Sequence, residues 1–120
     1  MATITIDRGE LVSIPFTITD SANGLANKRV TWSVARSANG ARALRKVGGL
    51  PGSSADITIT SQSASQIDGT INIALADFDI LTASSYVASL WIDDGAGAEF
   101  CVTPGGVEQL LITANVPRPA

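Results

Sequence analysis

Hydrophobic and polar residues alternate along most of the chain. Between residues 29 and 35, for example, Val30, Trp32 and Val34 occupy every second position, and polar or small residues stand between them. The same pattern recurs in six further stretches: 3–7, 11–19, 57–59, 71–75, 86–92 and about 107–116. Successive side chains of a strand point to opposite faces of its sheet, so this alternation predicts strands with one buried face. We therefore expect antiparallel sheets packed over a shared core.

Residues typical of tight turns separate these stretches. The four residues Ser-Ala-Asn-Gly occur twice, at 21–24 and at 37–40, and Asn-Gly tolerates the positive φ angles of hairpin turns. Residues 93–97 indicate another hairpin connection, and residues 48–54 indicate a longer loop. Short strands separated by such turns predict an all-β fold, an immunoglobulin-like antiparallel β-sandwich of about seven strands. We expect a single domain over residues 1–116 and a C-terminal tail over residues 117–120.

The phase of the alternation also predicts the core. Pro15 cannot donate to a sheet ladder, so its strand should lie at an edge or carry a bulge. Residues 77–81 break the alternation and predict one helical turn, capped by Asp77, in which Phe78 and Leu81 cover an end of the core. The residues expected in the core are Ile14, Phe16, Ile18, Val30, Trp32, Val34, Ile71, Ile73, Leu75, Tyr86, Ala88 and Leu90.

Composition limits the class of partner. The chain has 120 residues, is 45% hydrophobic and carries a net charge of −3. An acidic chain argues against bulk nucleic-acid binding, which needs a surplus of Lys and Arg. The start of the chain lacks the basic and apolar regions of a signal peptide, and no stretch approaches the ~20 apolar residues of a membrane helix. We expect a protein made in the cytoplasm that binds neither nucleic acid nor membrane.

Candidate catalytic and metal-binding residues are few. The chain has no histidine, which excludes Ser-His and Cys-His catalytic pairs. Cys101, the only cysteine, lies in a short apolar run and is expected to be a buried structural thiol. Two acidic pairs, Asp77 with Asp79 and Asp93 with Asp94, offer oxygen ligands of the kind that calcium prefers, but neither matches an EF-hand loop, and turn and cap roles explain all four carboxylates. We expect no enzyme activity, no cofactor and no required metal.

Two segments resemble a known family. The first reads Ile-Pro-Phe-Thr-Ile-Thr-Asp at 14–20, turns at 24–25 and continues as Val-Thr-Trp-Ser-Val at 30–34. The second reads Asp-Gly-Thr-Ile-Asn-Ile at 68–73, turns at 77–81 and continues as Tyr-Val-Ala-Ser-Leu-Trp-Ile at 86–92. Together they resemble the immunoglobulin-like module at the start of tailed-phage baseplate upper proteins and of related head or tail accessory proteins. The resemblance implies an adaptor located in the virion and assembled in the host cytoplasm, with other virion proteins as partners.

Three features are candidates for protein–protein contact. Trp32 shares the core face of its strand, whereas Trp91 lies on the opposite face from Leu90 and Ile92 and should point outward, where it would make a good interface anchor. The segment between residues 28 and 46 holds six of the eight basic residues, and the chain is mainly acidic afterwards. The prolines of the tail cannot donate to a sheet, and a terminus is usually ordered only when something holds it. The predicted contact residues are Trp91, Arg42, Arg45, Lys46, Pro117, Arg118 and Pro119.

Alternative interpretations remain open for these residues. The basic segment is either a solvated strand face or an edge that docks on an acidic surface, which a second copy of the chain would also offer. Trp91 is also a suitable platform for a sugar ring, as in a carbohydrate- or receptor-binding sandwich. An isolated sugar binder should be a stable monomer, whereas a virion module should self-associate or need a partner.

Overall fold

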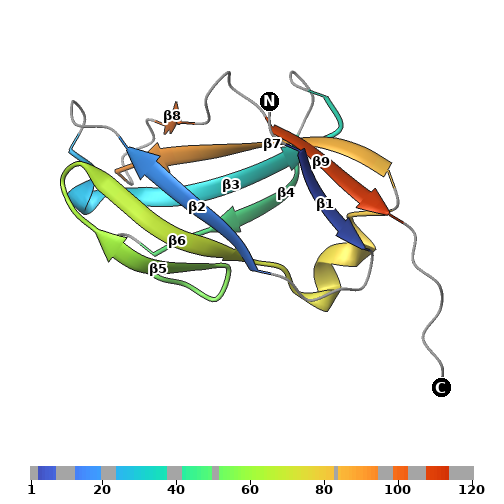
Figure 1. Ribbon diagram of the computed structural model, residues 1–120, viewed down its shortest axis with the longest axis horizontal. Coiled ribbons are helices and arrows are strands. Elements are labelled where there is room, and N and C mark those ends of the chain that lie inside the picture. The colour runs from blue at the N-terminus through green and yellow to red at the C-terminus, as the bar shows by residue number, and fades with distance from the viewer. Residues whose placement is uncertain are drawn as a thin grey trace.

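The protein folds into strands and two short 3₁₀ helices (Figure 1). The computed structural model describes residues 3–7, 13–19, 24–37, 42–49, 52–82, 84–94, 99–102 and 108–113. In chain order, the elements in these ranges are β1 (Thr3–Asp7), β2 (Ser13–Thr19), η1 (Leu25–Asn27), β3 (Arg29–Ala35), β4 (Arg42–Val47), β5 (Ile57–Gln62), β6 (Gln66–Asn72), η2 (Leu75–Asp79), β7 (Ser84–Asp93), β8 (Glu99–Cys101) and β9 (Glu108–Thr113). The predicted tail, with Pro117, Arg118 and Pro119, lies outside the described residues.

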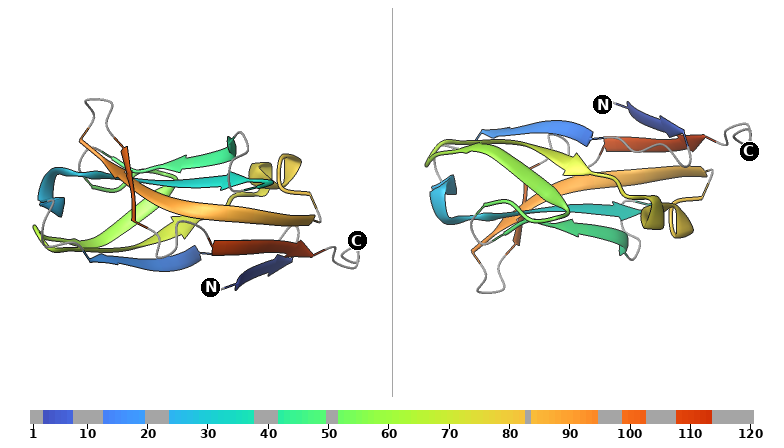
Figure 2. Two further views of the ribbon diagram at one scale, coloured as in Figure 1. Left: turned by 90° about the horizontal axis from the view of Figure 1, so that it is seen from above. Right: turned by 90° about the horizontal axis from the view of Figure 1, so that it is seen from below.

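The strands form two sheets, which confirms the prediction of an all-β sandwich. The larger sheet has the order β1-β9-β7-β3-β4, with β8 also paired to β7, and the smaller sheet has the order β2-β6-β5. Figure 2 shows how strongly the larger sheet twists between its β4 edge and its β1 edge. In immunoglobulin-like sandwiches one sheet contains the C, F and G strands and the other the B, E and D strands. Here β3, β7 and β9 correspond to the first set, and β2, β6 and β5 to the second.

The expectation of purely antiparallel sheets is wrong at one edge. Strand β1 pairs with β9 in parallel, from Thr3 opposite Gln109 to Asp7 opposite Thr113. Strand β2, the next element in the chain, belongs to the smaller sheet, so β1 does not form a hairpin with its sequence neighbour. The first strand therefore lies along the last one, in the same direction.

Nine strands are found among the described residues, where about seven were expected. Strand β4 lacks a clear alternation because Lys46 occupies an inward position, opposite Trp32. Strand β8 has only three residues. Strand β6 begins earlier than predicted. Its inward positions are Ile67, Gly69 and Ile71, and the glycine interrupts the hydrophobic alternation in the sequence. A Cβ atom at Gly69 would lie 2.2 Å from the carbonyl oxygen of Thr58.

The core agrees with the predicted phase except at Leu75. That side chain is 61% exposed because it begins η2 and does not continue β6. Ile14 and Phe16 are half-buried and pack against the core, and the other predicted core residues are buried. Pro15 lies on β2, an edge strand of the smaller sheet, as its missing donor predicted.

The turn between β6 and β7 has the predicted role. Phe78 and Leu81 are both buried and cover an end of the core. The helical turn starts two residues earlier than predicted, at Leu75, so Asp77 is not the N-cap but the third residue of η2, and its Oδ2 accepts the N–H of the N-cap Ala74 at 2.7 Å. The Thr82 N–H donates to the hydroxyl of Tyr86 at 3.0 Å, and that hydroxyl lies 3.2 Å from the Thr82 carbonyl oxygen. This arrangement is the tyrosine corner of immunoglobulin-like sandwiches, which ties the start of β7 to the turn before it.

Candidate functional site

The candidate site lies on the outward face of the larger sheet, formed by the side chains that alternate with core residues on β3, β4 and β7. Strand β3 contributes Arg29, Thr31, Ser33 and Ala35 to this face, and Arg29 forms an ion pair there with Asp93 of β7. The register places Trp91 opposite Thr31, Ser89 and Arg45 on either side of Ser33, and Val87 and Arg42 on either side of Ala35. We call these residues, with Val47, the outward face.

Trp91 and Arg42 meet on the outward face. The Arg42 guanidinium carbon stands over the Trp91 ring, 5.4 Å from its centroid, and the Trp91 side chain is half-buried. Cation–π contacts of this kind occur within about 6 Å of the ring centroid. Two residues that the sequence analysis selected separately, about 50 positions apart in the chain, are therefore one structural unit.

Two hydroxyl groups are buried at the base of the outward face. Thr31 is 0% exposed and Ser33 is 7% exposed, although both point away from the core. Among the described residues, Thr31 Oγ1 and Ser33 Oγ have no hydrogen-bond partner. A buried hydroxyl without a partner costs about 1–3 kcal/mol of stability. The free domain thus carries two unfavourable polar groups on a face that ordinary strand geometry would leave open to water.

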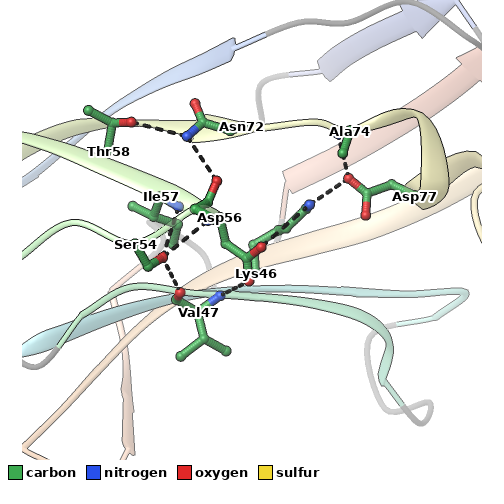
Figure 3. Close-up of polar contacts among 10 residues, drawn as sticks. Lys46, Val47, Ser54, Asp56, Ile57, Thr58, Asn72, Ala74 and Asp77 are labelled. Atoms are coloured by element: carbon green, nitrogen blue, oxygen red, sulfur yellow. Dashed lines mark hydrogen bonds and ion pairs between the residues drawn. The ribbon is translucent and has the colours of Figure 1, made fainter.

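Lys46 does not belong to the outward face, although the sequence analysis grouped it with Arg42 and Arg45. Its residue is 5% exposed, and its ammonium nitrogen lies 2.5 Å from Asp77 Oδ2 and 3.8 Å from Asp56 Oδ1 (Figure 3). It alternates with Arg45, so it must point inward when Arg45 points outward. We therefore remove Lys46 from the set of predicted contact residues and retain the exposed Arg42 and Arg45.

Polar contacts around Asp56 join β4 of the larger sheet to the segment that precedes β5 of the smaller sheet. The Val47 N–H donates to Asp56 Oδ2 at 3.1 Å, and the Ser54 hydroxyl donates to the Val47 carbonyl at 2.5 Å (Figure 3). The same Ser54 oxygen accepts from the N–H groups of Asp56 and Ile57. Lys46 and Asp56, with the backbone of Val47, thus form a structural link between the two sheets.

Arg36, which follows β3, belongs to the basic segment but not to the predicted contact residues. Its guanidinium carbon lies 5.0 Å from the centroid of the Tyr86 ring, and its Nη1 donates to the Ser84 hydroxyl at 3.1 Å. Together with Val87 and Leu111 it lines a hollow of about 200 Å³ beside β7 and β9. No periodicity marks this residue because it lies beyond the end of its strand. The outward orientation of Thr31 and Ser33, by contrast, follows from their alternation with Val30, Trp32 and Val34 in the sequence.

The candidate thiol and metal ligands of the sequence, Cys101 and the acidic pairs, form no metal-binding group among the described residues. Cys101 is exposed and lies opposite Trp91 in the β7–β8 pair, so the expectation of a buried thiol is wrong. Asp93 is buried and pairs with Arg29, whose Nη2 lies 3.1 Å from its Oδ1. Within the described ranges, no group of three or more acidic or cysteine side chains could hold a metal ion. The same residues include no helix long and apolar enough to cross a membrane.

The outer face of the smaller sheet has a different character. Its polar side chains bond to one another, since Asp68 accepts from Thr17 at 2.8 Å and from Gln66, and Asn72 donates to Thr58 at 3.0 Å. A face whose polar groups satisfy each other is typical of a solvated surface. The outward face of the larger sheet is therefore the better candidate for binding.

A second cavity opens between the two edge strands β1 and β2. Its volume is about 380 Å³, and it reaches the core residues Ile71 and Leu90. Its remaining lining is Ile4, Thr5, Ile6, Ser13, Ile14, Pro15 and Phe16. The cavity is largely apolar, and none of its lining side chains is charged.

No protein-family model and no curated protein sequence matches this chain. The resemblance to the phage module therefore stays a prediction that depends on the residues quoted for it.

Proposed function

We propose that this chain is a non-enzymatic structural or adaptor protein of a tailed-phage virion that acts through protein–protein contacts. In this proposal it is a component of the baseplate, the tail or the head surface, and its partners are other virion proteins and copies of itself. The resemblance of residues 14–34 and 68–92 to the phage module supports the virion assignment. The outward face supports the mode of action.

The stacked pair of Trp91 and Arg42 is the observation that carries the proposal. Tryptophan and arginine are enriched in protein interfaces, and they dominate the residues whose truncation weakens binding most. Here both stand on a sheet face that also carries the half-buried residues Ala35, Val47 and Val87. Such a surface can pack closely against another protein.

The same pair bears on the carbohydrate-binding alternative. A sugar stacks on an aromatic ring through an open ring face, and the Arg42 guanidinium stands over the Trp91 ring. A sugar would have to displace this cation, whereas an acidic protein would attract it. The geometry therefore favours a protein partner over a glycan.

Mass spectrometry of particles tests the proposal. Particles purified from cells that carry the gene should contain the chain at a fixed stoichiometry. A Trp91→Ala variant should fold and yet be depleted from the particles. Leu75→Ala is the control, since it also truncates an apolar side chain outside the core, but on η2. Absence of the wild-type chain from the particles would contradict the virion assignment, and equal incorporation of both variants would contradict the role of the outward face.

A further inference from the structure

We infer that the outward face holds a binding site for an acidic segment of a partner protein, and that Arg42 acts as its latch. In the free domain Arg42 rests on Trp91. In the complex it turns to a partner carboxylate, which opens the hydroxyls of Thr31 and Ser33 to the ligand. This inference depends on the proposed function, because it names the chemistry of the partner that the domain binds.

The two buried hydroxyls are the first observation. Thr31 Oγ1 and Ser33 Oγ lie on the outward side of β3 and have no hydrogen-bond partner among the described residues. Apolar groups of the same shape at these positions would avoid the cost of burying a polar group. Hydroxyls that are unfavourable in the free domain become favourable once a ligand supplies an acceptor or donor.

The path of the Arg42 side chain is the second observation. Arg42 stands opposite Ala35, and Trp91 stands opposite Thr31, on the two strands that flank β3. Four residues along a strand span about 13 Å. Because the guanidinium carbon nevertheless reaches to 5.4 Å from the centroid of the Trp91 ring, the side chain must cross β3 near the level of Ser33. Its departure would therefore uncover both the ring and the hydroxyls.

The chemistry of the site selects a carboxylate. Arginine binds carboxylates through two parallel, charge-assisted hydrogen bonds, and serine and threonine hydroxyls can donate to the same group. Such a bond is stronger than a cation–π contact at an exposed site. Arg42 and Arg45 are both exposed on this face, and Arg36 lines the hollow next to it. An acidic protein segment matches this arrangement of cations, and a side chain next to its carboxylate could enter the hollow beside Val87 and Leu111.

A capped hexaglutamate peptide is the probe, with a capped hexalysine peptide for comparison. The Trp91 indole N–H resonance should shift on titration with hexaglutamate at low salt, and that of the fully buried Trp32 should not. Hexalysine should not shift either resonance.

Variants separate a specific site from general electrostatic attraction. Arg42→Gln should weaken hexaglutamate binding about tenfold, the effect of one charge-assisted interaction. Lys28→Gln removes the same charge at the end of η1 and should change the affinity less than about twofold, as expected for a distant, screened charge. Thr31→Val and Ser33→Ala should each weaken binding while leaving the unfolding midpoint equal to or above that of the wild type. If the hydroxyls only stabilised the fold, their removal would lower the unfolding midpoint, and a loss of affinity without a loss of stability would not be seen.

Several results would overturn the inference. Equal losses of affinity in Arg42→Gln and Lys28→Gln would show non-specific attraction. Unchanged binding in both hydroxyl variants would show that Thr31 and Ser33 do not contact the ligand. Tighter binding of a single-stranded oligonucleotide of equal charge would indicate a phosphate site. Dimerisation that masks Trp91 would indicate a second copy as the occupant. If the chain enters particles but does not bind hexaglutamate, the proposed adaptor function stands and the acidic-segment site is wrong. If the chain binds hexaglutamate through Arg42 but is absent from particles, the site stands and the virion assignment is wrong.

Discussion

The ammonium of Lys46 lies 2.5 Å from a carboxylate oxygen of Asp77, and both side chains are almost excluded from water. Lys46 belongs to β4 of the larger sheet, and Asp77 belongs to the 3₁₀ turn that leads from the smaller sheet back to β7. The carboxylate also accepts the Ala74 N–H, which closes the start of η2. One ion pair therefore fixes the edge of one sheet to the connection between the two.

Removal of one partner of this pair should destabilise the domain. In Lys46→Met the carboxylate of Asp77 stays buried without its cation, and uncompensated buried charges of this kind cost about 3–5 kcal/mol. Lys46→Met combined with Asp77→Asn should recover much of the loss, because no charge then remains buried. Urea unfolding followed by circular dichroism measures both effects. A single variant within about 0.5 kcal/mol of the wild type, the range of ordinary surface substitutions, would show that the pair has no such role.

Gly69 should tolerate no side chain. A Cβ atom at this position would lie 2.2 Å from the carbonyl oxygen of Thr58 and 3.0 Å from the ring of Phe16. Gly69→Ala must therefore separate β5 from β6, and we expect a loss of about 1–3 kcal/mol or more, as in other overpacked sites. Gly24→Asn is the control. Gly24 has a φ angle of 63° with open space around it, and asparagine tolerates this conformation better than most residues. Equal stability of Gly69→Ala and the wild type would mean that the two strands are not paired as described.

Particular residues show how far the sequence could predict this fold. The alternation in β3 and β7 predicted both strands because hydrophobic burial on one face dominates there. Strand β4 remained undetected since Lys46 faces inward, where only its distant partner Asp77 makes a charge acceptable. The outward position of Trp91 followed from strand phase, but its contact with Arg42 did not. That contact depends on which strands are neighbours and on their register, and neither is encoded locally.

The hydroxyl of Tyr86 should stabilise the turn that precedes β7. In Tyr86→Phe the Thr82 N–H and carbonyl lose their side-chain partner. Because Thr82 is exposed, water can replace part of the interaction, and we expect a loss of about 0.5–1.5 kcal/mol, the usual net value of a hydrogen bond. Amide hydrogen exchange at Thr82 should accelerate more than exchange in the centre of β3. Thr82→Val keeps both backbone bonds to the hydroxyl, so it should affect the turn less.

Cys101 offers a chemical test of the outward face. Its side chain is exposed, and it lies opposite Trp91 in the β7–β8 pair, so both side chains point to the same side of the sheet. A thiol reagent such as iodoacetamide should therefore modify the folded protein at pH 8 without denaturant. Modification only after unfolding would contradict the exposed position of Cys101.

The same thiol then reports on binding. A partner that covers Trp91 must also approach Cys101, because directly opposed residues of antiparallel strands have Cβ atoms about 4.5–5.5 Å apart. Bound partner should slow iodoacetamide modification, and Trp91→Ala should restore the rate by weakening the complex. In Cys101→Ser the partner should still bind, since no role in recognition is assigned to the sulfur. Unchanged modification in the presence of a saturating partner would place the interface elsewhere on the domain.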